Sequence, residues 1–116
     1  MTKSKLYTCT IPLKPEWTKL GYSIDPVKRL TDIFGADLLC SVDYKIFNVT
    51  SDEFDAQTLE RVWKQTLKPH RVKRSLVCKH NQIIERTVPH TEVFKLTIDN
   101  LLTDLSDLVY EHTTLV

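Results

Sequence analysis

Hydrophobic and polar residues alternate with a period of two along two stretches of the chain. Such alternation is typical of strands that bury one face. The first stretch is residues 5–13, where prolines close the pattern, and the second is residues 38–49. The apolar face of the second stretch consists of Cys40, Val42, Tyr44 and Ile46. We therefore predict two strands in a sheet whose other face meets solvent, with a loop over residues 14–24.

The first predicted helix is defined by its capping residues. Asp25 is a favourable N-cap, Pro26 suits the first helical position, and Gly35 suits the left-handed position that ends a helix. These signals predict a helix over residues 26–34. Its inner face contains Val27, Leu30, Ile33 and Phe34.

A second helix is predicted to follow the second strand. Thr50-x-x-Glu53 is a capping box, which marks the start of a helix. The helix should end near Lys68, because Pro69 cannot continue it. Its buried stripe consists of Leu59, Val62, Trp63 and Leu67.

A β-hairpin is predicted from two short runs, residues 72–78 and 83–88, on either side of a polar loop. Neither face of this hairpin is wholly apolar. We therefore expect it at the edge of a sheet or projecting from the domain, where its charges remain hydrated. The predicted register pairs Cys78 with Ile83, Val77 with Ile84, Leu76 with Glu85 and Ser75 with Arg86.

The C-terminal quarter of the chain fits two patterns. Alternation through Phe94 and Leu96 predicts a strand to about residue 97, followed by a helix that Asp99 caps and that runs to about Glu111. The same segment also fits one continuous helical stripe. We prefer the strand followed by the helix.

The apolar stripe of this C-terminal helix has two interpretations. It contains Leu101, Leu105 and Leu108. Such a stripe either packs on the sheet of its own chain or forms an interface with a second copy. We prefer the intrachain core and keep the interface as the alternative.

The composition is that of an ordinary folded domain. Of the 116 residues, 41% are hydrophobic and 27% are charged, and only two are glycine. These values exclude collagen-like and low-complexity chains. With the elements above, they predict a single α+β domain over residues 1–116, with a mixed or mostly antiparallel sheet of four or five strands packed by two or three helices.

Several classes of protein are disfavoured. No apolar run is long enough to span a membrane, and the N-terminal residues do not resemble a signal peptide. Cys9, Cys40 and Cys78 are too widely spaced for a redox or zinc pair. We therefore expect reduced thiols in a cytosol, no metal and no cofactor.

Charge is distributed unevenly along the chain. Residues 61–90 contain eight Lys/Arg and one Asp/Glu, whereas residues 1–60 and 91–116 are net acidic. A basic surface with an aromatic ring suits phosphates, unpaired bases or an acidic protein face. The alternative is a solvated face balanced by the acidic flanks. The candidate binding residues are Arg61, Lys64, Lys68, Arg71, Lys73, Arg74, Lys79, Arg86 and Trp63.

Catalysis by the same segment is an alternative. His70, His80 and Glu85 are the acid and base types that a metal-independent endoribonuclease needs, and the neighbouring cations would stabilise a phosphate. No spacing in the sequence forces these groups together. The histidine spacing also matches no zinc-ligand pattern.

These observations favour a small, cytosolic, non-enzymatic binding protein. It would dock a protein or a nucleic acid through the basic segment. Inhibitors, immunity proteins and virus- or phage-encoded modulators share this size and charge, although such likeness is an analogy only. One alternative is an RNA-binding protein or endoribonuclease that uses the same surface. The other is a structural subunit that oligomerises through the C-terminal helix.

Overall fold

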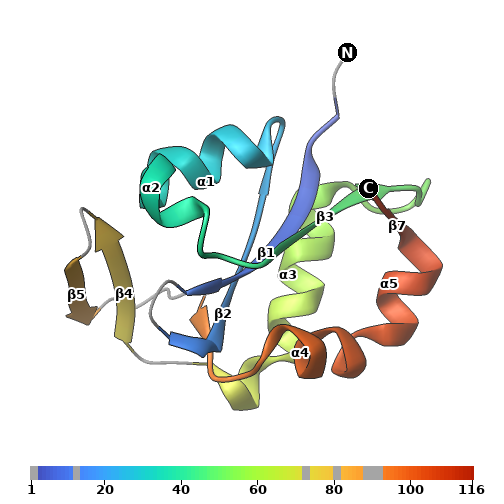
Figure 1. The fold of residues 1–116 in the computed structure, drawn as a ribbon. Helices are drawn as coiled ribbons and strands as arrows, with labels where there is room; N and C mark the ends of the chain where they lie inside the picture. The colour runs from blue at the N-terminus through green and yellow to red at the C-terminus, as the bar shows by residue number, and fades with distance from the viewer. Residues whose placement is uncertain (1–2, 12–13, 72–73, 80–81, 88–92) are drawn as a thin grey trace.

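A five-stranded antiparallel sheet forms the centre of the structure, which is a computed structural model (Figure 1). The backbone is described for residues 3–11, 14–71, 74–79, 82–87 and 93–116; side chains at positions 14–15, 38, 74–79 and 82–87 are not. The strands are β1 (Lys5–Ile11), β2 (Lys14–Ser23), β3 (Tyr44–Val49), β6 (Val93–Phe94) and β7 (Thr113–Leu115), in the order β6-β2-β1-β3-β7. The α+β class and the first predicted strand are confirmed.

Strand β2 corrects the prediction of a loop over residues 14–24. It pairs antiparallel with β1 along almost its whole length, from Lys5 opposite Ser23 to Thr10 opposite Thr18. Its fully buried positions include Thr18 and Leu20. Because Thr18 is polar although buried, the alternation of hydrophobic residues in β2 is not visible in the sequence. The prolines near the start of β2 also resemble the end of a strand. Pairing with β1, the preceding strand, supplies the stabilisation that the local pattern of β2 does not reveal.

The second predicted strand is shorter than expected. Residues Ala36–Leu39 form a short helix, α2, and only Tyr44–Val49 form β3. Cys40 and Tyr44, predicted to be buried, are exposed, whereas Phe47 is 2% exposed. The same predicted face is confirmed at Val42, which is 7% exposed, and at Ile46, which packs against the cluster that contains Tyr7. Cys40 differs because it follows α2 and is not part of the strand.

Two apolar clusters cover the two faces of the sheet. One joins Leu6 and Phe47 to residues of the helices after β3. The other joins Tyr7, Cys9 and Ile11 to the helix that precedes α2. Figure 1 shows α1 and α2 on one side of the sheet and α3, α4 and α5 on the other. The bounds are α1 (Pro26–Phe34), α3 (Ala56–Thr66), α4 (Ile98–Asp104) and α5 (Ser106–His112).

Helix α1 has the predicted bounds and the predicted cap. The Asp25 side chain accepts a hydrogen bond from the Lys28 backbone N–H at 3.2 Å. Gly35, at the other end, has a φ of +85°, a backbone conformation that residues with a Cβ rarely adopt. Leu30 and Phe34 are buried as expected, but Val27 is 41% exposed. A nine-residue helix buries only a narrow stripe of side chains against the sheet, and Val27 lies at the edge of this stripe.

Helix α3 begins later than the capping box predicts. Its N-cap is Asp55, which accepts a hydrogen bond from the Thr58 N–H at 2.8 Å. Leu59, Trp63 and Leu67 are buried as expected. Glu60 is also buried, at 5% exposed, which the sequence analysis did not predict. After α3 the chain makes a short 3-10 helix, η1 (Lys68–His70).

The predicted hairpin is confirmed in strand type and register. Strands β4 (Arg74–Lys79) and β5 (Gln82–Thr87) pair antiparallel, with Cys78 opposite Ile83 and Ser75 opposite Arg86. They form a two-stranded sheet separate from the central one. Strand β4 lies beside α1 and β6, and β5 is outermost, at the left of Figure 1. The hairpin therefore projects from the body, as its mixed faces predicted.

The C-terminal segment is a short strand followed by helices, which confirms the preferred pattern. Thr97, rather than Asp99, caps α4, accepting a hydrogen bond from the Asn100 N–H at 3.3 Å. The helical region is divided at Leu105 into α4 and α5, and β7 follows α5 at the edge of the sheet beside β3. In the described part of the chain, no helix is long and apolar enough to cross a membrane.

Replacing Gly21 with alanine should destabilise the protein. A Cβ at Gly21 would lie 2.5 Å from both Cζ and Oη of the buried Tyr7 ring. Overpacking of this kind costs about 1–3 kcal/mol, which urea denaturation would measure. The cost should shrink in a Tyr7→Leu background, because the clashing atoms are gone. An equal cost in both backgrounds would contradict this contact.

Replacing Leu105 with alanine should lower the free energy of unfolding without changing the mass of the protein in solution. Leu105 is 1% exposed within one chain, and truncation of a buried leucine costs about 2–5 kcal/mol. Urea denaturation measures the free energy of unfolding, and light scattering measures the mass in solution. Tyr110→Ala is the control, because Tyr110 is 89% exposed and surface changes stay within about 0.5 kcal/mol. A lower mass with unchanged stability would instead favour the interface alternative.

Candidate functional site

The basic residues of α3 and η1 differ in their surroundings. Arg61, Lys68 and Arg71 are exposed. Lys64 is half-buried and forms an ion pair with Glu60, one helical turn earlier. The carboxylate of Glu60 therefore neutralises part of the charge that the sequence assigns to this segment.

The remaining basic candidates lie in or next to the hairpin. The backbone places Arg74 opposite Thr87 and Arg86 opposite Ser75, so the two arginines occupy neighbouring register positions at the open end of the hairpin. Lys79 pairs with Gln82 at the other end, beside the turn. The position of Lys73 and the side chains of the other three lie outside the described residues.

Trp63 must be removed from the candidate binding surface. Its side chain is fully buried, and its ring meets that of Phe47 edge to face, with centroids 5.7 Å apart. The same tryptophan satisfied two sequence patterns, the buried stripe of a helix and an aromatic ring among cations. Packing decided between them, because a large apolar ring gains more from burial than from exposure.

Of the predicted acid and base residues, His70 is the one whose side chain is described, so the prediction that these groups act together is not tested. His70 lies 3.5 Å, from Nε2 to Oδ2, from Asp104 of α4, and its backbone carbonyl accepts a hydrogen bond from the Lys95 N–H. His80 and the side chain of Glu85 lie outside the described residues. Among the residues whose side chains are described, no group of three His, Cys, Asp or Glu could hold a metal ion.

The leucines of the candidate interface are packed within one chain. Leu101 and Leu105 are buried in the cluster between the sheet and α3, and Leu108 packs against this cluster while half-buried. The apolar surface of Leu101 and Leu105 is already covered, which corrects the assignment of these two residues to an interface. The reason is that the helical region turns at Leu105 and wraps around the core instead of forming one straight stripe.

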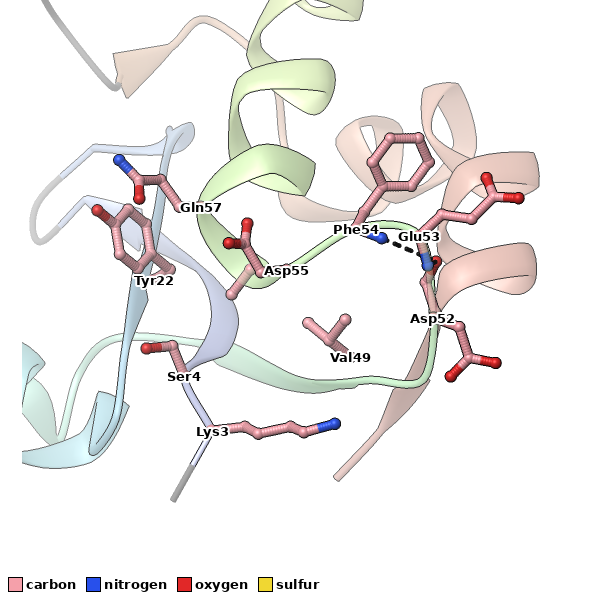
Figure 2. Close-up of a pocket in the computed structure, with 11 residues that line it drawn as sticks. Lys3, Ser4, Tyr22, Val49, Asp52, Glu53, Phe54, Asp55 and Gln57 are labelled. Atoms are coloured by element: carbon pink, nitrogen blue, oxygen red, sulfur yellow. Dashed lines mark hydrogen bonds between the residues drawn. The ribbon is translucent and has the colours of Figure 1, made fainter. Parts of the chain in front are cut away.

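A pocket of about 600 Å³ lies where the start of β1 meets the loop between β3 and α3 (Figure 2). Figure 2 shows Lys3 and Ser4 on one side, Val49 in the middle and Asp55 on the other side. The sequence analysis did not predict this pocket, because its walls come from separate segments. The lining residues are Lys3, Ser4, Tyr22, Val49, Ser51, Asp52, Glu53, Phe54, Asp55, Ala56 and Gln57.

The polar groups of this pocket mainly hold the loop and the start of α3. The Ser51 hydroxyl accepts hydrogen bonds from the N–H groups of Glu53 and Phe54. The carboxylate of Asp55 accepts a hydrogen bond from the Thr58 N–H, and this bond lowers the pKa of Asp55 below its usual value of 3.8. Phe54 packs edge to face against His112. These contacts give Asp55, among the acidic residues of the pocket, a structural role as the cap of α3.

A second, smaller cavity of about 340 Å³ shares Tyr22 with the first. It is lined by Tyr7, Gly21, Tyr22, Ser23, Arg29 and Glu60. Glu60 is a residue that sequence reasoning missed, although a signal was present. Residues Ala56, Glu60, Trp63 and Leu67 follow the four-three-four spacing of a buried helix face, with a carboxylate at the second position.

The described cysteines are free thiols in different environments. Cys9 is fully buried, and burial raises its pKa to about 12, so that it stays protonated at neutral pH. Cys40 is exposed. The side chain of Cys78 lies outside the described residues.

The Asp55 cap predicts a specific pH dependence. Because folding lowers the pKa of Asp55, its carboxylate stabilises the folded state above the usual pKa of 3.8, and this stabilisation is lost as the pH falls through the folded-state pKa. Asp55→Asn keeps a capping oxygen but does not ionise. The stability difference between the protein and this variant should therefore shrink below pH 3.8, as followed by urea denaturation at a series of pH values. Asp52→Asn controls for the loss of one charge, and a difference independent of pH would contradict the assignment.

Comparisons with protein-family models, curated proteins and solved structures found no match. Function must therefore be inferred from the residues and their geometry.

Proposed function

We propose that this protein is a non-enzymatic binding protein of the cytosol that docks an acidic protein partner through its basic segment, residues 61–90. It acts as an inhibitor or modulator, because occupying a partner's surface needs no chemistry of its own. The observation that carries the proposal is the β4–β5 hairpin, which forms a sheet of its own outside the central one.

The position of the hairpin supports docking. A two-stranded sheet adds little to a core, and an isolated hairpin is only marginally stable. Strand β4 is held against α1 and β6, and β5 lies on the outside (Figure 1). Three of the eight Lys/Arg positions of the basic segment, 74, 79 and 86, thus belong to a hairpin at one end of the molecule.

Exposed cations precede the hairpin. Arg71 forms a backbone bridge with Phe94 of β6, which ties the chain to the central sheet just before β4 begins. Arg71 and Lys68 remain exposed at this junction. An acidic protein face would meet positive charge on both the hairpin and its base, and such complementarity favours fast association and correct orientation.

An acidic protein fits better than a nucleic acid. Recognition of unpaired bases uses aromatic rings on which the bases stack, and the aromatic candidate of this segment, Trp63, is fully buried. With this ring buried, the remaining cations attract any polyanion and do not favour a nucleic acid. A protein partner can also pair with the backbone of an outer strand such as β5.

Reversing the two cations at the base of the hairpin should weaken binding at least about tenfold. The variant is Lys68→Glu with Arg71→Glu, and the control is Lys3→Glu with Lys45→Glu, which changes the net charge equally. The tagged proteins would be used to capture partners from the cytosol of the source cell, with and without nuclease, and thermal melting would verify that each variant folds.

A protein that survives nuclease, binds the control and is lost from the base variant would support the proposal. Loss of the bound species after nuclease would replace the acidic protein with a nucleic acid. Equal capture by both variants would show that the basic segment is not the docking surface.

A further inference from the structure

Strand β5 has one edge that no described strand covers. It pairs with β4 along all six of its residues, from Gln82 opposite Lys79 to Thr87 opposite Arg74. Within the part of the chain that the structure describes, β4 is its only strand neighbour, and Figure 1 shows β5 on the outside of the molecule. A free edge presents a row of backbone N–H and C=O groups, with which another chain can extend the sheet.

The register shows which backbone groups face this edge. Lys79 and Gln82 lie opposite each other across two intervening residues, and the pair that closes a hairpin of this length exchanges both backbone hydrogen bonds. Every second pair after it does the same, so alternate residues of β5 direct their N–H and C=O groups toward β4. The residues between them direct these groups to the free edge, and they are Ile83, Glu85 and Thr87.

The length of this edge distinguishes the hairpin from the central sheet. The outer strands of the central sheet, β6 and β7, have two and three residues, whereas β5 has six. Short edge strands discourage pairing with other chains, and long ones favour it. A two-stranded sheet is also only marginally stable, and a third strand stabilises it. The hairpin therefore gains stability from a strand that a partner supplies.

Charge decides which kind of strand fits the edge. On one face of the hairpin, the register places Lys79 near the turn and Arg86 near the open end. Ile84 and Val77 lie opposite each other between them. A second copy would bring the same excess of cations to the edge, because residues 61–90 contain eight Lys/Arg and one Asp/Glu. Opposite charges on neighbouring strands stabilise a sheet and like charges destabilise it, so an acidic strand fits better than a second copy.

We propose that an acidic protein partner adds an extended segment to the free edge of β5, as the third strand of this sheet. The segment has an apolar residue, with one carboxylate two positions before it and another two positions after it, because alternate residues of a strand share a face. The apolar residue lies in the row of Ile84, and the carboxylates lie in the rows of Lys79 and Arg86. This inference rests on the proposed docking function and specifies how the partner binds.

Proline substitution at one edge residue tests strand addition. Proline lacks the backbone N–H and is tolerated in an edge strand where that N–H faces solvent. Glu85→Pro thus removes a donor of the free edge and keeps the pairing with β4. Glu85→Ala is the matched control, because it removes the same carboxylate and keeps the N–H. The probe is a capped synthetic peptide, Thr-Glu-Thr-Val-Thr-Glu-Thr, labelled for fluorescence anisotropy.

The peptide should bind Glu85→Ala at least as well as the unsubstituted protein, and Glu85→Pro at least about tenfold more weakly. The same peptide with lysine in place of glutamate should also bind at least about tenfold more weakly. Amide hydrogen exchange in the unsubstituted protein is the second measurement, and it holds even if Glu85→Pro does not fold. The peptide should slow exchange at the Glu85 N–H much more than at the Ile84 N–H, which already faces β4.

The other outcomes decide against the inference. It is overturned if the peptide does not bind, if both Glu85 variants bind it equally or if the lysine peptide binds equally well. A dimer of the protein alone that Glu85→Pro disrupts would assign the edge to a second copy. If both Glu85 variants retain the partner that Lys68 and Arg71 capture, strand addition fails and the docking function stands. If no protein partner is captured at all, the docking function fails as well.

Discussion

Burial of β1 on both faces is the constraint on which the rest of the structure depends. Every residue from Leu6 to Ile11 is at most 6% exposed. Leu6 belongs to the cluster under α3, whereas Tyr7 and Cys9 belong to the cluster under α1. A strand buried on both sides needs a helical layer on each face and a paired strand on each edge. The arrangement β2-β1-β3 with helices above and below meets this requirement.

The buried threonines of β1 show how this constraint is met without orphaned polar groups. The Thr8 hydroxyl donates to the carbonyl of Lys19 at 3.0 Å. The Thr10 hydroxyl accepts from the Asp43 N–H at 3.1 Å. Buried hydroxyls are stable only with such partners, so these bonds join β1 to β2 and to the start of β3 within the core.

Charge and burial separate the molecule into two chemical regions. The hairpin and its base carry five of the eight Lys/Arg residues of the basic segment, whereas the cavity beside β2 is lined by the buried Glu60, which pairs with Lys64. A charged outer surface suits a large partner of opposite charge, because attraction acts over long range.

The sequence by itself determined the features that depend on neighbouring residues. The bounds and Asp25 cap of α1, the register of β4 and β5, and the burial of Leu59 in α3 follow from local caps, turns and periodicity. Only the tertiary structure decided that residues 14–23 are a strand, that Trp63 belongs to the core and not also to the basic surface, and that Glu60 lines a cavity. These outcomes depend on which segments pack together, because strand pairing with β1 and packing of helices on both faces of the sheet outweigh weak local preferences.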